Sequence, residues 1–256
     1  MNKTPLIVAN WKMNPAVPAQ AVLLAKKIEK SLASVRNVEV VVAPPFPFLI
    51  PVASALKRTQ LGSQDACWQD VGPYTGDVSW RQLQHLNVTY SIVGHSERRT
   101  HAGETDEMVN KKVRALLENN MVPILCIGEH ERTGDDIPAY VGEQIEHALD
   151  NVKKIFVKNL VIAYEPIWAI STTPHAHPNT PENTFRAMIY IRQIISKLYG
   201  RMLGQEIRVI YGGSVTAKNI RAFLVDGHTE GALVGSASID PKEFSEIIHI
   251  ASKATF

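Results

Sequence analysis

The 256-residue sequence is poor in cysteine, has no long apolar run and carries little net charge. Its two cysteines, Cys67 and Cys126, are too few for a disulfide framework, which favours a reducing compartment. No apolar stretch approaches the roughly 20 residues of a membrane span, and a formal net charge of +2 gives no support to nucleic-acid binding. The segment Met1–Ala9 lacks the parts of a secretion signal. We therefore expect a soluble, cytoplasmic protein with no membrane or nucleic-acid partner.

What the sequence does contain is a regular alternation of short apolar runs and helical patterns. Some runs are apolar throughout, such as Val40–Ala43 and Ile124–Ile127, as expected of strands buried on both faces of a parallel sheet. The eight predicted strands are Leu6–Ala9, Val38–Ala43, Gln60–Ser63, Thr89–Val93, Val122–Ile127, Leu160–Tyr164, Ile207–Tyr211 and Gly231–Val234.

Apolar residues at helical spacing separate these runs, for example from Val22 to Leu32 and from Ile189 to Leu198. Pro181 and the pair Asp240-Pro241 mark the starts of two helices, because proline is tolerated in a first helical turn. Eight strands alternating with helices predict an α/β fold, a (β/α)8 or TIM barrel in which outer helices surround a closed, parallel eight-stranded barrel. No linker or repeat divides the chain, so residues 1–256 are predicted to form a single domain.

Polar residues follow several predicted strands, where such barrels carry their catalytic groups. Asn10 and Lys12 follow the first strand, His95 and Glu97 the fourth, and Glu165 the sixth. Lys12 would place a cation at the mouth of the barrel, and His95 at the start of a helical turn would stay neutral and able to donate a hydrogen bond. Glu165, between a buried strand and an apolar loop, would be a strong base once water is excluded. Each residue alone also has a purely structural interpretation, such as a surface lysine or a glutamate paired with an arginine.

Glycine-rich turns follow the last two predicted strands, at 211–215 and 231–238. Glycine lets backbone amides approach an anion closely, and loops at these two positions often bind phosphate in such barrels. The turns indicate a phosphate site that includes Ser214, Gly235 and Ser236. A single glycine-rich turn would indicate no more than a turn.

Taken together and in this order, the motifs resemble the triosephosphate isomerase family. The resemblance extends from Val8 to about Ser238, and Gln64 and the segment Cys126–Glu129 also match. The resemblance implies interconversion of dihydroxyacetone phosphate and D-glyceraldehyde 3-phosphate through an enediol or enediolate, in glycolysis and gluconeogenesis. It implies no metal and no organic cofactor. It also implies a homodimer, in which the loop Trp68–Ser79 inserts beside the partner's active site.

The resemblance further implies a role for each site residue. Glu165 would be the base that moves the proton between carbons, and neutral His95 would polarise the carbonyl and shuttle protons between oxygens. Lys12 and Asn10 would assist by electrostatics and orientation, with Glu97 as an auxiliary group near Lys12. The phosphate would be bound by Ser171, Ser214, Gly235 and Ser236. In the dimer, Thr75 would support the partner's Asn10 and Glu97.

The loop after Glu165 continues to about Pro178, long enough to be a lid, and departs from the family. After Trp168 the family usually reads Ala-Ile-Gly-Thr-Gly-Lys, whereas this chain has Ala-Ile-Ser-Thr-Thr-Pro. Ser171 replaces a glycine whose amide grips phosphate, so the contact survives only if Ser171 does not need a positive φ. Pro174 fixes one φ near the expected second hinge, and we expect a lid with altered closing.

Further departures lie outside the lid. Ser236 replaces a glycine of the phosphate loop, where it either crowds the anion or donates a hydroxyl group. Ser63 and Asp65 stand where the family commonly has Ala and Asn.

Other interpretations are a metal site at His175-Ala176-His177, a phosphate-binding barrel without catalysis, and an enzyme of another phosphate-using barrel family. No further ligand stands beside the two histidines at suitable spacing, so exposed lid residues are favoured over a metal site. A binding module needs no base, and the combination of motifs disfavours another family.

Overall fold

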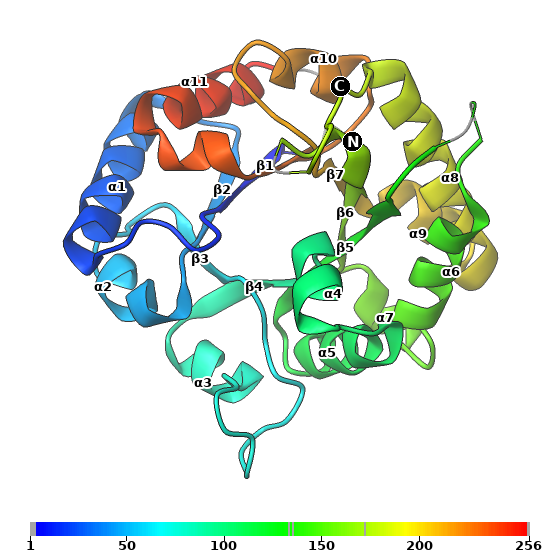
Figure 1. Ribbon diagram of the computed structural model, residues 1–256, viewed down its shortest axis with the longest axis horizontal. Coiled ribbons are helices and arrows are strands. Elements are labelled where there is room, and N and C mark those ends of the chain that lie inside the picture. Colours follow the sequence, from blue (N-terminus) through cyan, green and yellow to red (C-terminus); the bar gives the residue numbers. More distant parts are fainter. Residues whose placement is uncertain (1–3, 133, 135, 172, 255–256) are drawn as a thin grey trace.

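The computed structural model describes residues 4–132, 134, 136–171 and 173–254, and its strands form a closed, all-parallel barrel in the order β1 to β8 (Figure 1). Each strand pairs with the next along the chain, and β8 pairs with β1. This confirms the predicted barrel and all eight predicted strands, with ends shifted by no more than two residues. The strands are β1 Leu6–Asn10, β2 Glu39–Ala43, β3 Gln60–Ser63, β4 Val88–Val93, β5 Val122–Glu129, β6 Val161–Pro166, β7 Arg208–Tyr211 and β8 Gly231–Val234.

Helices surround the barrel (Figure 1). The predicted starts at Pro181 and Pro241 are confirmed: Thr180 caps the first helix through its hydroxyl group, and Asp240 caps the second. None of the helices within the described ranges is long and apolar enough to span a membrane. The helices are α1 Pro18–Ser31, α2 Leu49–Ala53, α3 Trp80–His85, α4 Ser96–Ala102, α5 Asp106–Glu118, α6 Ala139–Ala148, α7 Lys154–Val157, α8 Pro181–Tyr199, α9 Arg201–Glu206, α10 Ile220–Val225 and α11 Pro241–Ser252.

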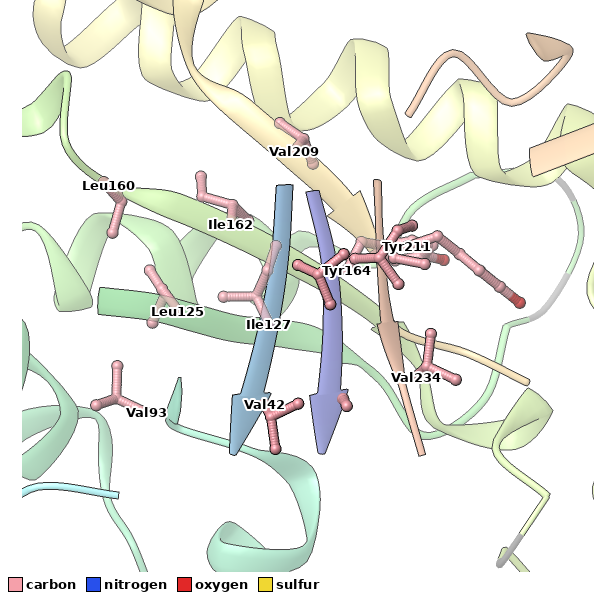
Figure 2. Packing of buried hydrophobic residues seen from close by; sticks show 14 of the residues in the cluster. Val42, Val93, Leu125, Ile127, Leu160, Ile162, Tyr164, Val209, Tyr211 and Val234 are labelled. Carbon is pink, nitrogen blue, oxygen red and sulfur yellow. The ribbon is translucent and has the colours of Figure 1, made fainter. Parts of the chain in front are cut away.

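The strands other than β3 are largely apolar because each of them contributes to two apolar layers. Along β1, Leu6 and Val8 belong to a cluster of side chains contributed by the strands, whereas Ile7 and Ala9 pack in the larger cluster that includes the helices. Figure 2 shows Leu125, Ile127 and Ile162 of this larger cluster on β5 and β6. Burial on both faces fixes the strands, and therefore the polar residues at their carboxyl ends.

Candidate active site

The turn after β1 holds Lys12 in a left-handed conformation, with φ of 51°, which is uncommon for a residue other than glycine. The amide N of Lys12 donates to Oδ1 of Asn10 at 3.0 Å, and Nε2 of Gln64 donates to the carbonyl O of Lys12 at 2.7 Å. The Nζ of Lys12 lies 2.5 Å from Oε1 of Glu97. The cation is therefore positioned both by its own backbone turn and by a carboxylate from another βα unit.

The turn after β4 fixes the orientation and the tautomer of His95. Gly94 follows this strand with φ of +70°, a value that favours glycine, and the chain then enters α4. The Nδ1 of His95 accepts a hydrogen bond from the amide N of Glu97 at 3.2 Å. A ring nitrogen that accepts carries no proton, so the N–H of this imidazole is on Nε2. The ring is only 6% exposed.

The carboxylate of Glu165, at the end of β6, is 2% exposed and only half engaged in hydrogen bonds. Its Oε2 accepts from the amide N of Ser96 at 3.0 Å. Its Oε1 lies 3.2 Å from Nε2 of His95, but this contact does not have the angles of a hydrogen bond, and no residue that the structure describes donates to this oxygen. Gly212 leaves room for this side chain, because a Cβ there would stand 2.9 Å from Cγ of Glu165. A buried carboxylate oxygen without a donor can accept a proton from a ligand.

A cavity of about 410 Å³ opens where the strands end. Seven of the nine predicted site residues line it: Asn10, Lys12, His95, Ser171, Ser214, Gly235 and Ser236. The other two do not line it but contact residues that do: Glu97 pairs with Lys12, and Glu165 lies beside His95. The structure therefore brings all the predicted site residues into one region.

Some residues of this region were not predicted as site residues. Asp240 and Glu243 also line the cavity, but their carboxylates are engaged: Asp240 caps α11, and Oε1 of Glu243 accepts from the amide N of Ala217 at 2.7 Å. The amide of Ser96 is a backbone group that every residue other than proline has, so no sequence signal identifies it as the partner of Glu165. The pair Asp240-Pro241 predicted the start of a helix, but gave no sign that Asp240 lines the cavity.

The segment after β6 lies beside the cavity and is tied to the loop after β7. Ser171 is not among the residues with positive φ, so its backbone does not require glycine. The carbonyl O of Ala169 accepts from both the amide N of Ser214, at 3.3 Å, and its Oγ, at 2.7 Å. Farther along, Oγ1 of Thr173 donates to the carbonyl O of Ile167 at 2.7 Å. Ser171 thus meets the condition expected for a phosphate contact, which is a backbone conformation without a positive φ.

No three His, Cys, Asp or Glu side chains come together as a metal ligand set in the part of the chain that the structure describes. The ring of His177 instead stacks on the indole of Trp168, with 4.6 Å between centroids and 25° between planes. Near Glu165, burial and the charge of that carboxylate raise the pKa of the Cys126 thiol well above its usual range, so this thiol stays neutral.

Comparisons with known proteins agree with this arrangement. A family model described as triosephosphate isomerase matches residues 5–251. The triosephosphate isomerase of Caldanaerobacter subterraneus subsp. tengcongensis is 40% identical over 96% of this chain and 99% of that protein. Those of Dictyoglomus thermophilum (39%, over 95% of this chain and 98% of that protein) and Clostridium botulinum (40%, over 96% and 99%) are similarly close. A closed eight-stranded barrel, a lysine, histidine and glutamate at its mouth, and a match along nearly the whole chain together show that this protein belongs to the triosephosphate isomerase family.

Proposed function

We propose that this chain is an aldose–ketose isomerase that interconverts dihydroxyacetone phosphate and D-glyceraldehyde 3-phosphate through an enediol or enediolate, in glycolysis and gluconeogenesis. The observation that supports it most directly is the unengaged Oε1 of buried Glu165, 3.2 Å from Nε2 of His95. A base, a neutral donor and the cation of Lys12 meet the needs of proton transfer next to a carbonyl.

Each group has one task in the proposed reaction. Glu165 takes a proton from the carbon next to the carbonyl and returns it to the neighbouring carbon. His95 donates from Nε2 to the carbonyl oxygen as negative charge develops there, and it carries a proton between the two substrate oxygens. Lys12, held by Glu97, and Asn10 stabilise that negative charge. The sum is a rearrangement of hydrogen within one molecule, so no cofactor is required.

The phosphate group of the substrate is proposed to bind at Ser171, Ser214, Gly235 and Ser236, all on the cavity wall. Ser236 is exposed at the start of the short 3₁₀ helix Ser236–Ile239, which supports its hydroxyl group as a donor to the anion. A Cβ at Gly235 would stand 3.5 Å from Cε of Lys12, so the phosphate loop lies against the catalytic cation.

A homodimer remains a prediction, and exposed apolar side chains support it. The loop Trp68–Ser79 extends away from the barrel before α3 (Figure 1). Val71 and Tyr74 on this loop are 74% and 41% exposed, and Met13, beside the active-site lysine, is 91% exposed. A partner that covers such side chains removes apolar surface from water. A cytoplasmic location and a single domain over residues 1–256 likewise remain predictions.

The experiment that tests the function is a coupled assay of glyceraldehyde 3-phosphate isomerisation with the wild type and Glu165→Gln. The variant keeps the size of the side chain and removes the base, so we expect a loss of kcat of about 10²- to 10⁴-fold. Binding of inorganic phosphate, measured by calorimetry, should be unchanged and serves as the control for folding. A wild type that binds phosphate without turnover would indicate a binding module instead.

A further inference from the structure

The two ends of the segment beside the cavity are joined to each other. At one end Trp168 belongs to the short 3₁₀ helix Ile167–Ala169, and at the other His177 lies shortly before α8. Their rings stack with 4.6 Å between centroids, and the amide N of His177 donates to the carbonyl O of Trp168 at 3.0 Å. A ring contact and a backbone hydrogen bond thus close the segment into a loop.

Trp168 is the fixed member of this pair. Its indole is 9% exposed, and its Nε1 lies 3.4 Å from Oε1 of Glu129, which is fully buried. Oε1 of Glu129 also accepts from Nη2 of Arg132 at 2.7 Å and from the hydroxyl group of Tyr164 at 2.6 Å. The indole is therefore anchored to β5 and to β6, which carries Glu165, whereas His177 is exposed and contributes the second ring.

The residues between the two rings include part of the cavity wall. Ile170 and Ser171 line the cavity, and Ala169 accepts both hydrogen bonds from Ser214. A segment whose ends are tied has fewer conformations when the cavity is empty, so it loses less entropy when a ligand orders it. The contact at His177 therefore bears on how well Ser171 is prearranged for an anion.

We propose that His177 is a positioning residue: by stacking on Trp168, its imidazole prearranges Ser171 for the phosphate group. The proposal deepens the proposed function, because it concerns the phosphate part of the same site. His177 does not touch the reacting atoms, and its effect appears in binding and not in the proton transfer itself.

The variant that tests this is His177→Asn, which removes the ring. The chain offers a matched control in His228→Asn, because His228 and Phe185 also have ring centroids 4.6 Å apart, and neither residue lines the cavity. A third variant, His177→Phe, keeps an aromatic ring at position 177. The readouts are the dissociation constant of inorganic phosphate by calorimetry, and kcat and KM for glyceraldehyde 3-phosphate.

We expect His177→Asn to weaken phosphate binding and raise KM by about two- to tenfold, the range that a stacked ring pair commonly contributes, with kcat changed less than about twofold. His177→Phe should restore both values, and His228→Asn should leave both unchanged. A general loss of folding would lower kcat through the active fraction and leave KM the same.

The proposal is overturned if His177→Asn leaves phosphate binding and KM at the wild-type values, or if His177→Phe fails to restore them. Phosphate binding needs no turnover, so this arm tests His177 even if the wild type proves to have no isomerase activity. A failure of the proposed function, seen as no turnover, is thereby distinguished from a failure of this proposal, seen as unchanged phosphate binding.

Discussion

The carboxylate of Asp65 belongs to a cluster of charged side chains next to the turn that carries His95. Its Oδ1 lies 2.7 Å from Nζ of Lys112, and its Oδ2 lies 2.8 Å from Nη2 of Arg98. Lys112 also pairs with Glu104, whose Oε2 accepts from the amide N of Gly94 at 3.2 Å. Burial is the largest influence on Asp65, and with the repulsion from Glu104 it raises the pKa of this carboxyl group despite the two cations.

We predict that Asp65→Asn stabilises the protein at neutral pH. Because the folded-state pKa of Asp65 is raised, its favourable contribution is present below the unfolded-state pKa and is lost as pH rises through the folded-state value. Asparagine has no such loss. We expect the melting temperature to rise by about 2–4 °C at pH 7, as about 1 kcal/mol gives in a domain of this size, and hardly at pH 4. Thermal unfolding at the two pH values measures this, and an equal change at both would contradict it.

At the scale of single residues, the sequence predicted which side chains meet but not how each is held. Lys12, His95 and Glu165 were identifiable because they lie at or just after the carboxyl ends of buried strands, and parallel strands bring such residues to one end of a barrel. The left-handed turn at Lys12 and the amide of Ser96 on Glu165 depend on backbone geometry. Such geometry is set by contacts between distant segments, which residue types alone do not specify.

At the scale of elements, strands were more predictable than helices. Apolar runs mark strands that are buried on both faces, and even the short, polar strand β3 has the predicted bounds. β5 extends two residues beyond its last apolar residue, because Gly128 pairs with Glu165 and Glu129 pairs with Pro166. Of α4 only the start, the helical turn at His95, was predicted and is confirmed; the extent of the helix was not, since its sequence, SERRTHA, is almost entirely polar and shows no apolar period.

The segment after Trp168 is the element for which we predict the clearest difference from the family. The triple variant Ser171→Gly, Thr173→Gly and Pro174→Lys introduces the usual family residues. Two glycines and the loss of a proline increase the conformational freedom of the unliganded segment. We therefore expect phosphate to bind about 8- to 150-fold more weakly, since each of the three residues is worth about 0.4–1 kcal/mol, and more methylglyoxal to escape per turnover. Equal phosphate affinity and equal methylglyoxal release would refute this.

At the scale of the whole molecule, the barrel provides the site and the proposed dimer completes it. We predict that Tyr74→Ala combined with Thr75→Ala weakens dimerisation and activity in parallel. Truncation of a tyrosine anchor costs about 2 kcal/mol or more, which is about a 30-fold rise in the dimer dissociation constant. Analytical ultracentrifugation and the coupled assay over a dilution series measure the two effects. Met202→Ala is the control, because Met202 is 66% exposed and lies outside this loop; an unchanged sedimentation coefficient of the double variant would count against the dimer.

Because β8 pairs with β1, the barrel can close only when nearly the whole chain has left the ribosome. Lys12 is synthesised near the start, whereas Gly235, which lies beside it in the cavity wall, comes near the end. A nascent chain that stops before β8 leaves β1 and β7 as open sheet edges, which are able to pair with other chains. The cavity is therefore complete only with the last βα unit, and until then the two open edges of the sheet are exposed to other chains.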